Sequence, residues 1–207
     1  MRWSLLRGFL MARIYQPLSH RPLLSGSQFR HPVPSNERVR LESPAIAVMT
    51  DLRQVPAATI DPEAPVDAAN RFMIRRGVRL LLVTDDQRQI LGLITATDIL
   101  GERPVTFAVE RSVRRSDILV RDIMTPERQL ETLWYPDLAV AEVGHVLATL
   151  KTAGRQHALV AETSTEGPGQ IVRGIFSLSQ IARQLGVHIP SNEVAGTFAE
   201  IEAALGH

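Results

Sequence analysis

The fold is decided by GLITATDI at residues 92–99, because the same pattern occurs again as GIFSLSQI at residues 174–181. Each copy starts with glycine, passes through two apolar residues to a hydroxyl side chain, and ends with a polar residue and isoleucine. A pattern that recurs within one chain indicates a duplicated structural unit. The flanking sequence should then repeat as well.

The flanking sequence does repeat, in two further segments that keep their order. AVMT at residues 47–50 recurs within DIMTP at residues 122–126, and GVRLLLV at residues 77–83 recurs as GRQHALV at residues 154–160. The three pairs are 75, 77 and 82 residues apart, so the extra residues lie between the segments. The largest insertion contains residues 163–169, whose glycines and proline favour a hairpin tip that can lengthen without disturbing the strands. The chain therefore consists of two similar halves.

Hydrophobic periodicity gives the first half the element order β-α-β-β-α. We expect strands at 59–60, 80–83 and 90–94, a helix over 66–76, and a second helix that begins near Asp98. The glycine after the first helix is a typical helix end. The continuous apolar run of the middle strand is typical of a strand buried on both faces.

Each half has a small sheet with helices on one side, which leaves an apolar face uncovered. The other half can cover it, so we expect an α/β (α+β) fold in which two β-α-β-β-α halves pack with pseudo-twofold symmetry. The first helix of the second half is predicted over 140–153. We divide the chain into a basic, Pro-rich N-terminal arm at 1–45, a first domain at 46–108, a linker and second domain at 109–187, and a C-terminal amphipathic helix at 188–207. The apolar stripe of that helix is formed by Val194, Phe198, Ile201 and Leu205.

The composition excludes several classes of site. There is no cysteine, which removes disulfide scaffolds, thiolate metal sites and thiol nucleophiles. The six histidines show no metal-ligand spacing, and the chain has neither a Gly-x-Ser-x-Gly elbow nor a Gly-x-x-x-x-Gly-Lys phosphate loop. A net charge of +1 and the lack of a recognition-helix pattern argue against a nucleic-acid partner. No apolar run approaches the roughly 18–20 residues that cross a membrane. We therefore expect no catalytic residue, no metal site and no membrane contact.

The N-terminal arm has one unusual bias. It contains several arginines and no acidic residue before Glu37. This composition fits an organelle transit peptide, and it also fits a flexible basic arm, so both readings stay open.

Together, the Met-Thr openings, the helix-Gly-strand passages and the Gly-apolar-apolar-Thr/Ser endings resemble a tandem pair of cystathionine-β-synthase-type (CBS) domains, or Bateman module, over about residues 46–187. The resemblance implies a regulatory, non-enzymatic and cytoplasmic module. Its ligand would be an adenine nucleotide bound between the halves: AMP, ADP or ATP, with NAD or S-adenosylmethionine as second choices. The resemblance also implies a disc-like homodimer and a client protein whose behaviour the module changes.

The ending motif of the first half offers residues for a nucleotide cleft. An ionised Asp98 at a helix start has two acceptor oxygens, which match the two vicinal hydroxyls of a ribose. Thr95 and Thr97 are two residues apart, so on a strand both hydroxyls would face the same cleft. The alternative is that Asp98 only caps the helix. By resemblance, the main chain at Thr59 and Ile60 contacts the base.

Two residues that follow the helix-ending glycines are phosphate-binding candidates by resemblance. Arg79 can hold phosphate with two hydrogen bonds, although a solvated surface arginine also fits. His157 is the weaker candidate, since a lone histidine beside an apolar strand is more often a hydrogen-bonded core residue. In the second half Ser177 and Ser179 keep the hydroxyls, but Gln180 replaces the aspartate and has one acceptor oxygen and no charge. We therefore predict one good cleft in the first half and a weaker, empty or altered one in the second.

Two classes of function stay open. A ligand sensor binds an adenine nucleotide and changes its assembly or its partner, whereas a structural interaction module joins proteins and leaves its clefts empty. Thermal unfolding with and without nucleotide separates them, because a ligand that binds only the folded state raises the melting temperature.

Overall fold

The computed structural model describes most of the chain after the N-terminal arm, and every described residue lies in the compact unit formed by residues 37–207. The described residues are 39–165, 169–187, 198, 200, 201 and 203.

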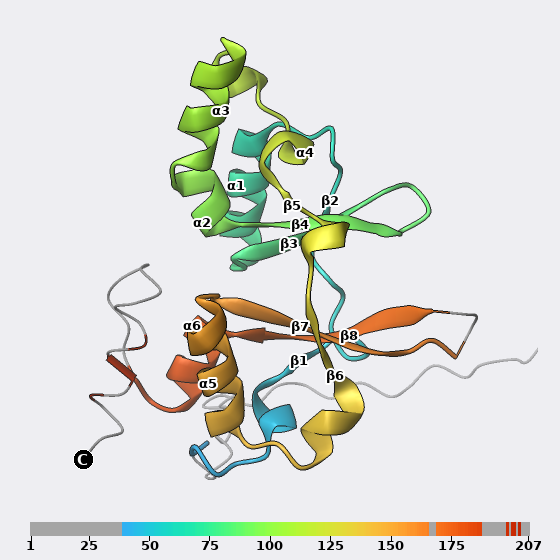
Figure 1. Cartoon of the computed structure of the whole chain (residues 1–207), viewed down its shortest axis with the longest axis vertical. Coiled ribbons are helices and arrows are strands. Elements are labelled where there is room, and N and C mark those ends of the chain that lie inside the picture. The colour runs from blue at the N-terminus through green and yellow to red at the C-terminus, as the bar shows by residue number, and fades with distance from the viewer. Residues whose placement is uncertain (1–38, 166–168, 188–197, 199, 202, 204–207) are drawn as a thin grey trace, which may run out of the picture. The chain divides into compact units, whose positions relative to one another are not determined.

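Eight short strands form two sheets of four within this part of the chain (Figure 1). In chain order the strands are β1 (Thr50–Asp51), β2 (Thr59–Ile60), β3 (Leu80–Thr84), β4 (Ile90–Thr95), β5 (Thr125–Pro126), β6 (Thr132–Trp134), β7 (His157–Thr163) and β8 (Gln170–Ser177). One sheet has the strand order β2-β3-β4-β5, and the other has the order β1-β8-β7-β6.

The helices are divided between the two sheets. Figure 1 shows α1 to α4 beside the sheet that contains β3, and α5 and α6 beside the sheet that contains β7. The helices are α1 (Val66–Arg76), α2 (Ala96–Leu100), α3 (Arg103–Arg111), α4 (Val120–Ile123), α5 (Val143–Ala153) and α6 (Leu178–Gln184).

The two halves exchange strands at the edges of their sheets. β1 comes from the start of the first half but pairs antiparallel with β8, so that Thr50 lies opposite Ile175. β5 comes from the start of the second half but pairs antiparallel with β4, so that Thr125 lies opposite Leu93. The repeated Met-Thr segments are therefore the exchanged edge strands, and each sheet contains residues of both halves.

The glycine that starts each ending motif makes this exchange possible. A Cβ atom on Gly92 would overlap the backbone oxygen of Thr125 in β5, and a Cβ atom on Gly174 would overlap the side chain of Met49, next to β1. Neither glycine adopts a positive φ. The close approach of the exchanged strand therefore requires glycine here, rather than the freedom of its backbone.

The two halves are joined by a shared core. Each half has its own core between sheet and helices, which contains Met73 in the first half and Phe176 in the second. A third cluster lies between the sheets, where Leu80 and Leu82 of β3 pack with Leu159 of β7. β3 therefore faces a core on both sides, which is why its sequence is continuously apolar. The predicted fold class and the packing of one half on the other are confirmed.

A buried ion pair fixes the exchanged strand β1. Arg173 of β8 is only 6% exposed and forms a double ion pair with Asp51 of β1, in which Nη2 and Oδ2 are 2.9 Å apart. The hydrogen bond from Arg173 is the main reason that the pKa of Asp51 lies below its ordinary value. The guanidinium carbon also lies 5.0 Å from the ring centre of Tyr135. Side chains therefore hold a strand that has only two residues of its own.

Most elements predicted for the first half are confirmed. α1 spans the predicted residues, and Gly77 ends it in the left-handed conformation with a φ of 64°. The three expected strands are β2, β3 and β4. Periodicity is informative for α1 because this helix buries one apolar face, which contains Val66, Ala69 and Met73.

Two predicted boundaries are wrong. The helix predicted from residue 140 begins at Val143, because Glu142 occupies the N-cap position and Val140 is 88% exposed. The boundary placed after residue 108 falls inside α3. Phe107 in this helix packs against the core of the first half, so α3 belongs with that half.

The predicted arm and C-terminal helix lie largely outside the described residues. Of the C-terminal stripe, Phe198 and Ile201 are helical and buried in the core cluster of the second half. Val194, Leu205 and the arm as far as residue 38 lie outside the described residues. Within the described part of the chain, no helix has the length and apolar character needed to span a membrane.

Candidate functional site

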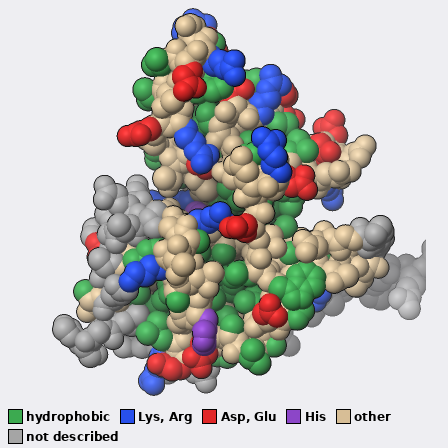
Figure 2. Space-filling model, viewed as in Figure 1, with side chains coloured by type: hydrophobic (Ala, Val, Ile, Leu, Met, Phe, Trp, Pro, Cys, Tyr) green, Lys and Arg blue, Asp and Glu red, His purple; other side chains and the backbone are tan. Residues whose placement is uncertain are grey.

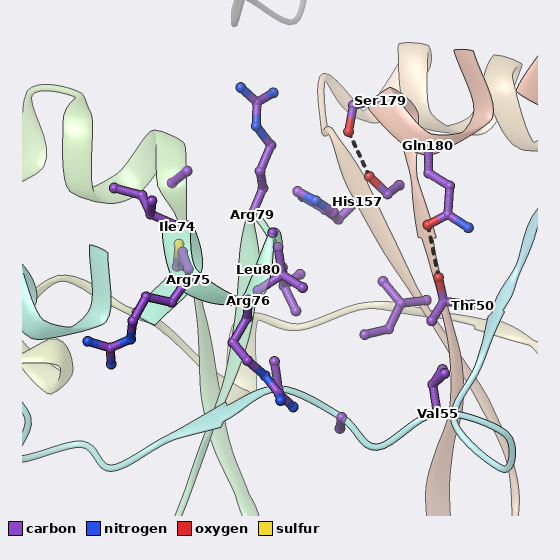
Figure 3. A pocket seen from close by; sticks show the side chains of 18 of the residues that line it. Thr50, Val55, Ile74, Arg75, Arg76, Arg79, Leu80, His157, Ser179 and Gln180 are labelled. Atoms are coloured by element: carbon purple, nitrogen blue, oxygen red, sulfur yellow. Dashed lines mark hydrogen bonds between the residues drawn. The ribbon is translucent and has the colours of Figure 1, made fainter. Parts of the chain in front are cut away.

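A cavity of about 1100 Å³ is lined by residues of both halves (Figure 3). The first half contributes Thr50 of β1, the segment 55–58 before β2, and the passage from the end of α1 into β3. The second half contributes His157 at the start of β7 and the passage from β8 into α6. The cavity is at the upper end of the size range of small-molecule sites.

The cavity has a strongly positive lining. Arg75, Arg76 and Arg79 come from the first half and Arg183 comes from α6. Among the described residues that line the cavity there is no aspartate or glutamate. Figure 2 shows acidic and basic side chains interspersed on one face of the molecule. The excess of positive charge therefore belongs to the cavity rather than to the chain, whose net charge is +1. Arginine is well suited to bind phosphate groups.

Hydroxyl and amide groups form the opposite wall. Figure 3 shows Ser179 and Gln180 across from the arginines of the first half, with His157 between them. The hydroxyl of Ser177 is 3.1 Å from that of Ser179. The hydroxyl of Thr50 donates to Oε1 of Gln180 at 3.1 Å, which orients the amide and uses one of the two lone pairs of its oxygen. The N–H groups of this amide remain as donors for a ligand.

His157 is a neutral histidine within a positive environment. It lies opposite Ser177 in the β7–β8 ladder and is half-buried. Burial lowers its pKa from 6.5 to about 4, and the nearby positive charge of Arg79 adds to the effect. At neutral pH the imidazole can therefore donate one hydrogen bond and accept another.

This lowered pKa gives the stability of the protein a specific pH dependence. Because the folded pKa is about 4 and the unfolded one is 6.5, the unfolded chain binds the proton first as the pH falls. We expect a loss of about 2 kcal/mol of unfolding free energy between pH 7 and pH 5 from this residue. In His157→Gln this part of the slope should disappear. Urea unfolding at several pH values measures it, and parallel curves for parent and variant would contradict the assignment.

Asp98 is placed differently from its prediction. α2 begins at Ala96 rather than near Asp98, because Thr95 is the N-cap and Asp98 is the third helical residue. Oδ2 of Asp98 accepts from the main-chain N–H of Thr95 at 2.8 Å and from its hydroxyl at 2.7 Å. Oδ1 is 3.0 Å from the guanidinium of Arg103. Asp98 therefore caps the start of α2 through a capping box with Thr95, and both of its carboxylate oxygens already have partners in the protein.

The expected shared strand face of two threonines is wrong. Thr95 ends β4, whereas Thr97 lies inside α2, is exposed, and has its hydroxyl 3.5 Å from Oε1 of Gln156. The two hydroxyls do not stand in one strand because the strand ends at the capping residue. The prediction had extended the strand too far.

The structure brings only part of the predicted site together. The cavity is lined by Arg79, His157, Ser177 and Ser179, together with Gln180. It is not lined by Thr59, Ile60, Thr95, Thr97 or Asp98, although the segment just before Thr59 does line it. A binding role for these five residues stays a prediction. Because the cavity is lined by Ser177, Ser179 and Gln180, it favours the ending motif of the second half as the candidate ligand-binding motif, rather than that of the first half.

Sequence reasoning missed three arginines and an apolar wall. Arg183 follows Gln180 by three residues, a spacing that puts both on one helix face. Arg75 and Arg76 form the last turn before the glycine that ends α1. The segment 55–58 has no periodic pattern. It lines the cavity because it follows β1, which pairs with β8 in the sheet of the second half, and no sequence pattern indicates this pairing.

Comparison with known proteins agrees with this architecture. Residues 46–104 match the family model of the CBS domain. An uncharacterized conserved protein from Pyrococcus horikoshii has a similar crystal structure, with 25% identity and a TM-score of 0.51 over 74% of this chain and 99% of that one. CBSX2 of Arabidopsis thaliana, solved in complex with AMP, is 19% identical, with a TM-score of 0.48 over 68% of this chain and 94% of that one.

An uncharacterized protein from Methanopyrus kandleri is 27% identical over 75 residues, which are 36% of this chain and 38% of that protein. The match thus spans little more than a third of the relative's length. Residues 46–104 thus match the CBS-domain model, and the second half repeats the elements and the ending motif of this segment. In this respect the chain is similar to a tandem pair of CBS domains, a Bateman module.

Proposed function

We propose that this chain is a regulatory module that binds an adenine nucleotide in the cavity between its two halves and thereby changes its own assembly or a partner protein. The observation that carries the proposal is the cavity itself. It combines an apolar wall, a set of hydroxyl and amide groups, and four arginines without a carboxylate among its described lining residues. These are the three kinds of surface that a base, a ribose and a phosphate group require.

Each part of a nucleotide has a complementary wall. The segment 55–58 and Leu80 offer apolar surface for the base. Ser177 and Gln180 lie where a ribose can form hydrogen bonds. Arg79 lies across from them, at a position from which its guanidinium can hold a phosphate. In this proposal Asp98 and its neighbours do not contact the nucleotide in the cavity, and any ligand that they bind occupies a second site.

The same cavity offers a route from ligand binding to assembly. Ile74 and Leu100 line it and are also 71% and 62% exposed. Val105 and Val109 of α3 add further exposed apolar side chains. Exposed apolar surface of this kind favours association with another protein surface. We propose that a homodimer or a client protein uses these helices, and that a bound nucleotide changes the association.

Thermal unfolding of the full chain with nucleotides tests the proposal. A ligand at one hundred times its dissociation constant should stabilise the folded state by about 2.7 kcal/mol. We expect AMP, ADP or ATP to raise the melting temperature, and adenosine, which lacks phosphate, to raise it less. If AMP, ADP, ATP, NAD and S-adenosylmethionine all leave the melting temperature unchanged, the cavity is not a nucleotide site. The chain would then act as a ligand-free interaction module.

A further inference from the structure

The two halves differ at one position that a ribose would contact. At corresponding places in the repeated motif, the first half has the carboxylate of Asp98 and the second half has the amide of Gln180. A carboxylate only accepts hydrogen bonds, so it suits a ribose with two free hydroxyls. The oxygen of Gln180 accepts from Thr50, and the amide also offers two N–H donors, which a carboxylate lacks. Donors suit a ligand that presents acceptor oxygens at this point.

The helix that carries Gln180 also carries a positively charged residue, Arg183. Arg183 lies three residues after Gln180 on α6, so the two residues occupy neighbouring positions on one helix face, and both line the cavity. Ser177 and Ser179 add two hydroxyls to the same wall. The described lining residues include no acidic side chain that would repel a bound anion.

The cavity thus has arginines from both halves, and arginine is suited to bind phosphate. Arg75, Arg76 and Arg79 line the cavity from the first half, and Arg183 lines it from the second half together with Gln180. Dinucleotide-binding proteins use the same distinction, with a carboxylate for a free ribose hydroxyl and an arginine for a ribose phosphate. On the basis of the proposed function, we infer that the ligand is a nucleotide that carries a phosphate on its ribose as well as at its 5′ end.

Three isomers of one composition test this inference. Isothermal titration of the full chain with ADP, adenosine 2′,5′-bisphosphate and adenosine 3′,5′-bisphosphate holds the number of phosphates constant and moves one of them to the ribose. This move also adds about one negative charge at neutral pH, whereas the 2′,5′ and 3′,5′ isomers carry the same charge. We expect at least one of the two bisphosphates to bind ten times or more as tightly as ADP, since a charge-assisted hydrogen bond is worth this much. This comparison uses the parent chain, so it needs no variant to fold.

Two variants then locate the effect. Gln180→Asp places a negative charge beside the ribose phosphate, so it should lower the ratio of bisphosphate affinity to AMP affinity at least tenfold. Arg183→Ala should weaken the same bisphosphate about tenfold more than it weakens AMP. ADP binding as tightly as both bisphosphates would overturn the inference and leave the proposed function intact. Binding of none of the four nucleotides, AMP included, would overturn the proposed function itself.

Discussion

Gly92→Ala is expected to lower the free energy of unfolding by about 3 kcal/mol, the upper end of the usual cost of overpacking. The added methyl group would overlap the backbone oxygen of Thr125, and a backbone atom can move only if the exchanged strand β5 moves with it. Gly92 has no positive φ, so the backbone itself tolerates alanine. The loss therefore measures how tightly the strand exchange is packed.

Gly174→Ala is the matched control for this prediction. Here the added methyl group meets the side chain of Met49, which is flexible and can turn away, so we expect a loss of about 1 kcal/mol or less. Urea unfolding of parent and both variants gives the comparison. Equal losses in the two variants would show that β5 is not held against β4 as described.

Arg79→Ala is expected to weaken the binding of ADP by a factor of about 10 to 100, the range for a hydrogen bond to a charged group. Arg79 lines the cavity opposite the serines and Gln180, and its charge contributes to the lowered pKa of His157. Adenosine has no phosphate, so its affinity should change less than twofold. Isothermal titration with both ligands separates a phosphate contact from a general disturbance of the cavity.

Two further variants give the controls for Arg79. Arg71→Ala removes an exposed arginine of α1 that does not line the cavity, so the affinity for ADP should stay within twofold of the parent. Arg79→Lys keeps the charge but loses the second hydrogen bond, so it should recover part of the affinity. Equal weakening of ADP and adenosine in Arg79→Ala would assign this residue a structural role.

Most of the fold could be predicted from the sequence because the chain contains an internal repeat. The helix at 66–76 and the apolar strand at 80–83 each carry a local pattern that is sufficient without tertiary contacts. The exchanged strands β1 and β5 carry no such pattern, because each has two residues. The ion pair between Asp51 and Arg173 joins positions 122 residues apart, so no local spacing reveals it.

The position of the cavity was harder to predict from the sequence than the fold, for a physical reason. In the sequence, Asp98 is the better candidate for a ligand-binding residue than Gln180, because its carboxylate is charged and has two acceptor oxygens. However, Thr95-x-x-Asp98 is also the pattern of a capping box, in which the carboxylate binds the helix start instead of a ligand. The glutamine of the second half makes no such box and stands beside the cavity. The cavity therefore lies beside the departure from the repeated pattern rather than beside its best match.

The most direct measurement is a crystal structure of the full chain grown with ADP. The account predicts electron density for the nucleotide in the cavity, with its phosphates beside Arg79 and its ribose beside Ser177 and Gln180. Density beside Asp98, with the cavity left to solvent, would contradict it.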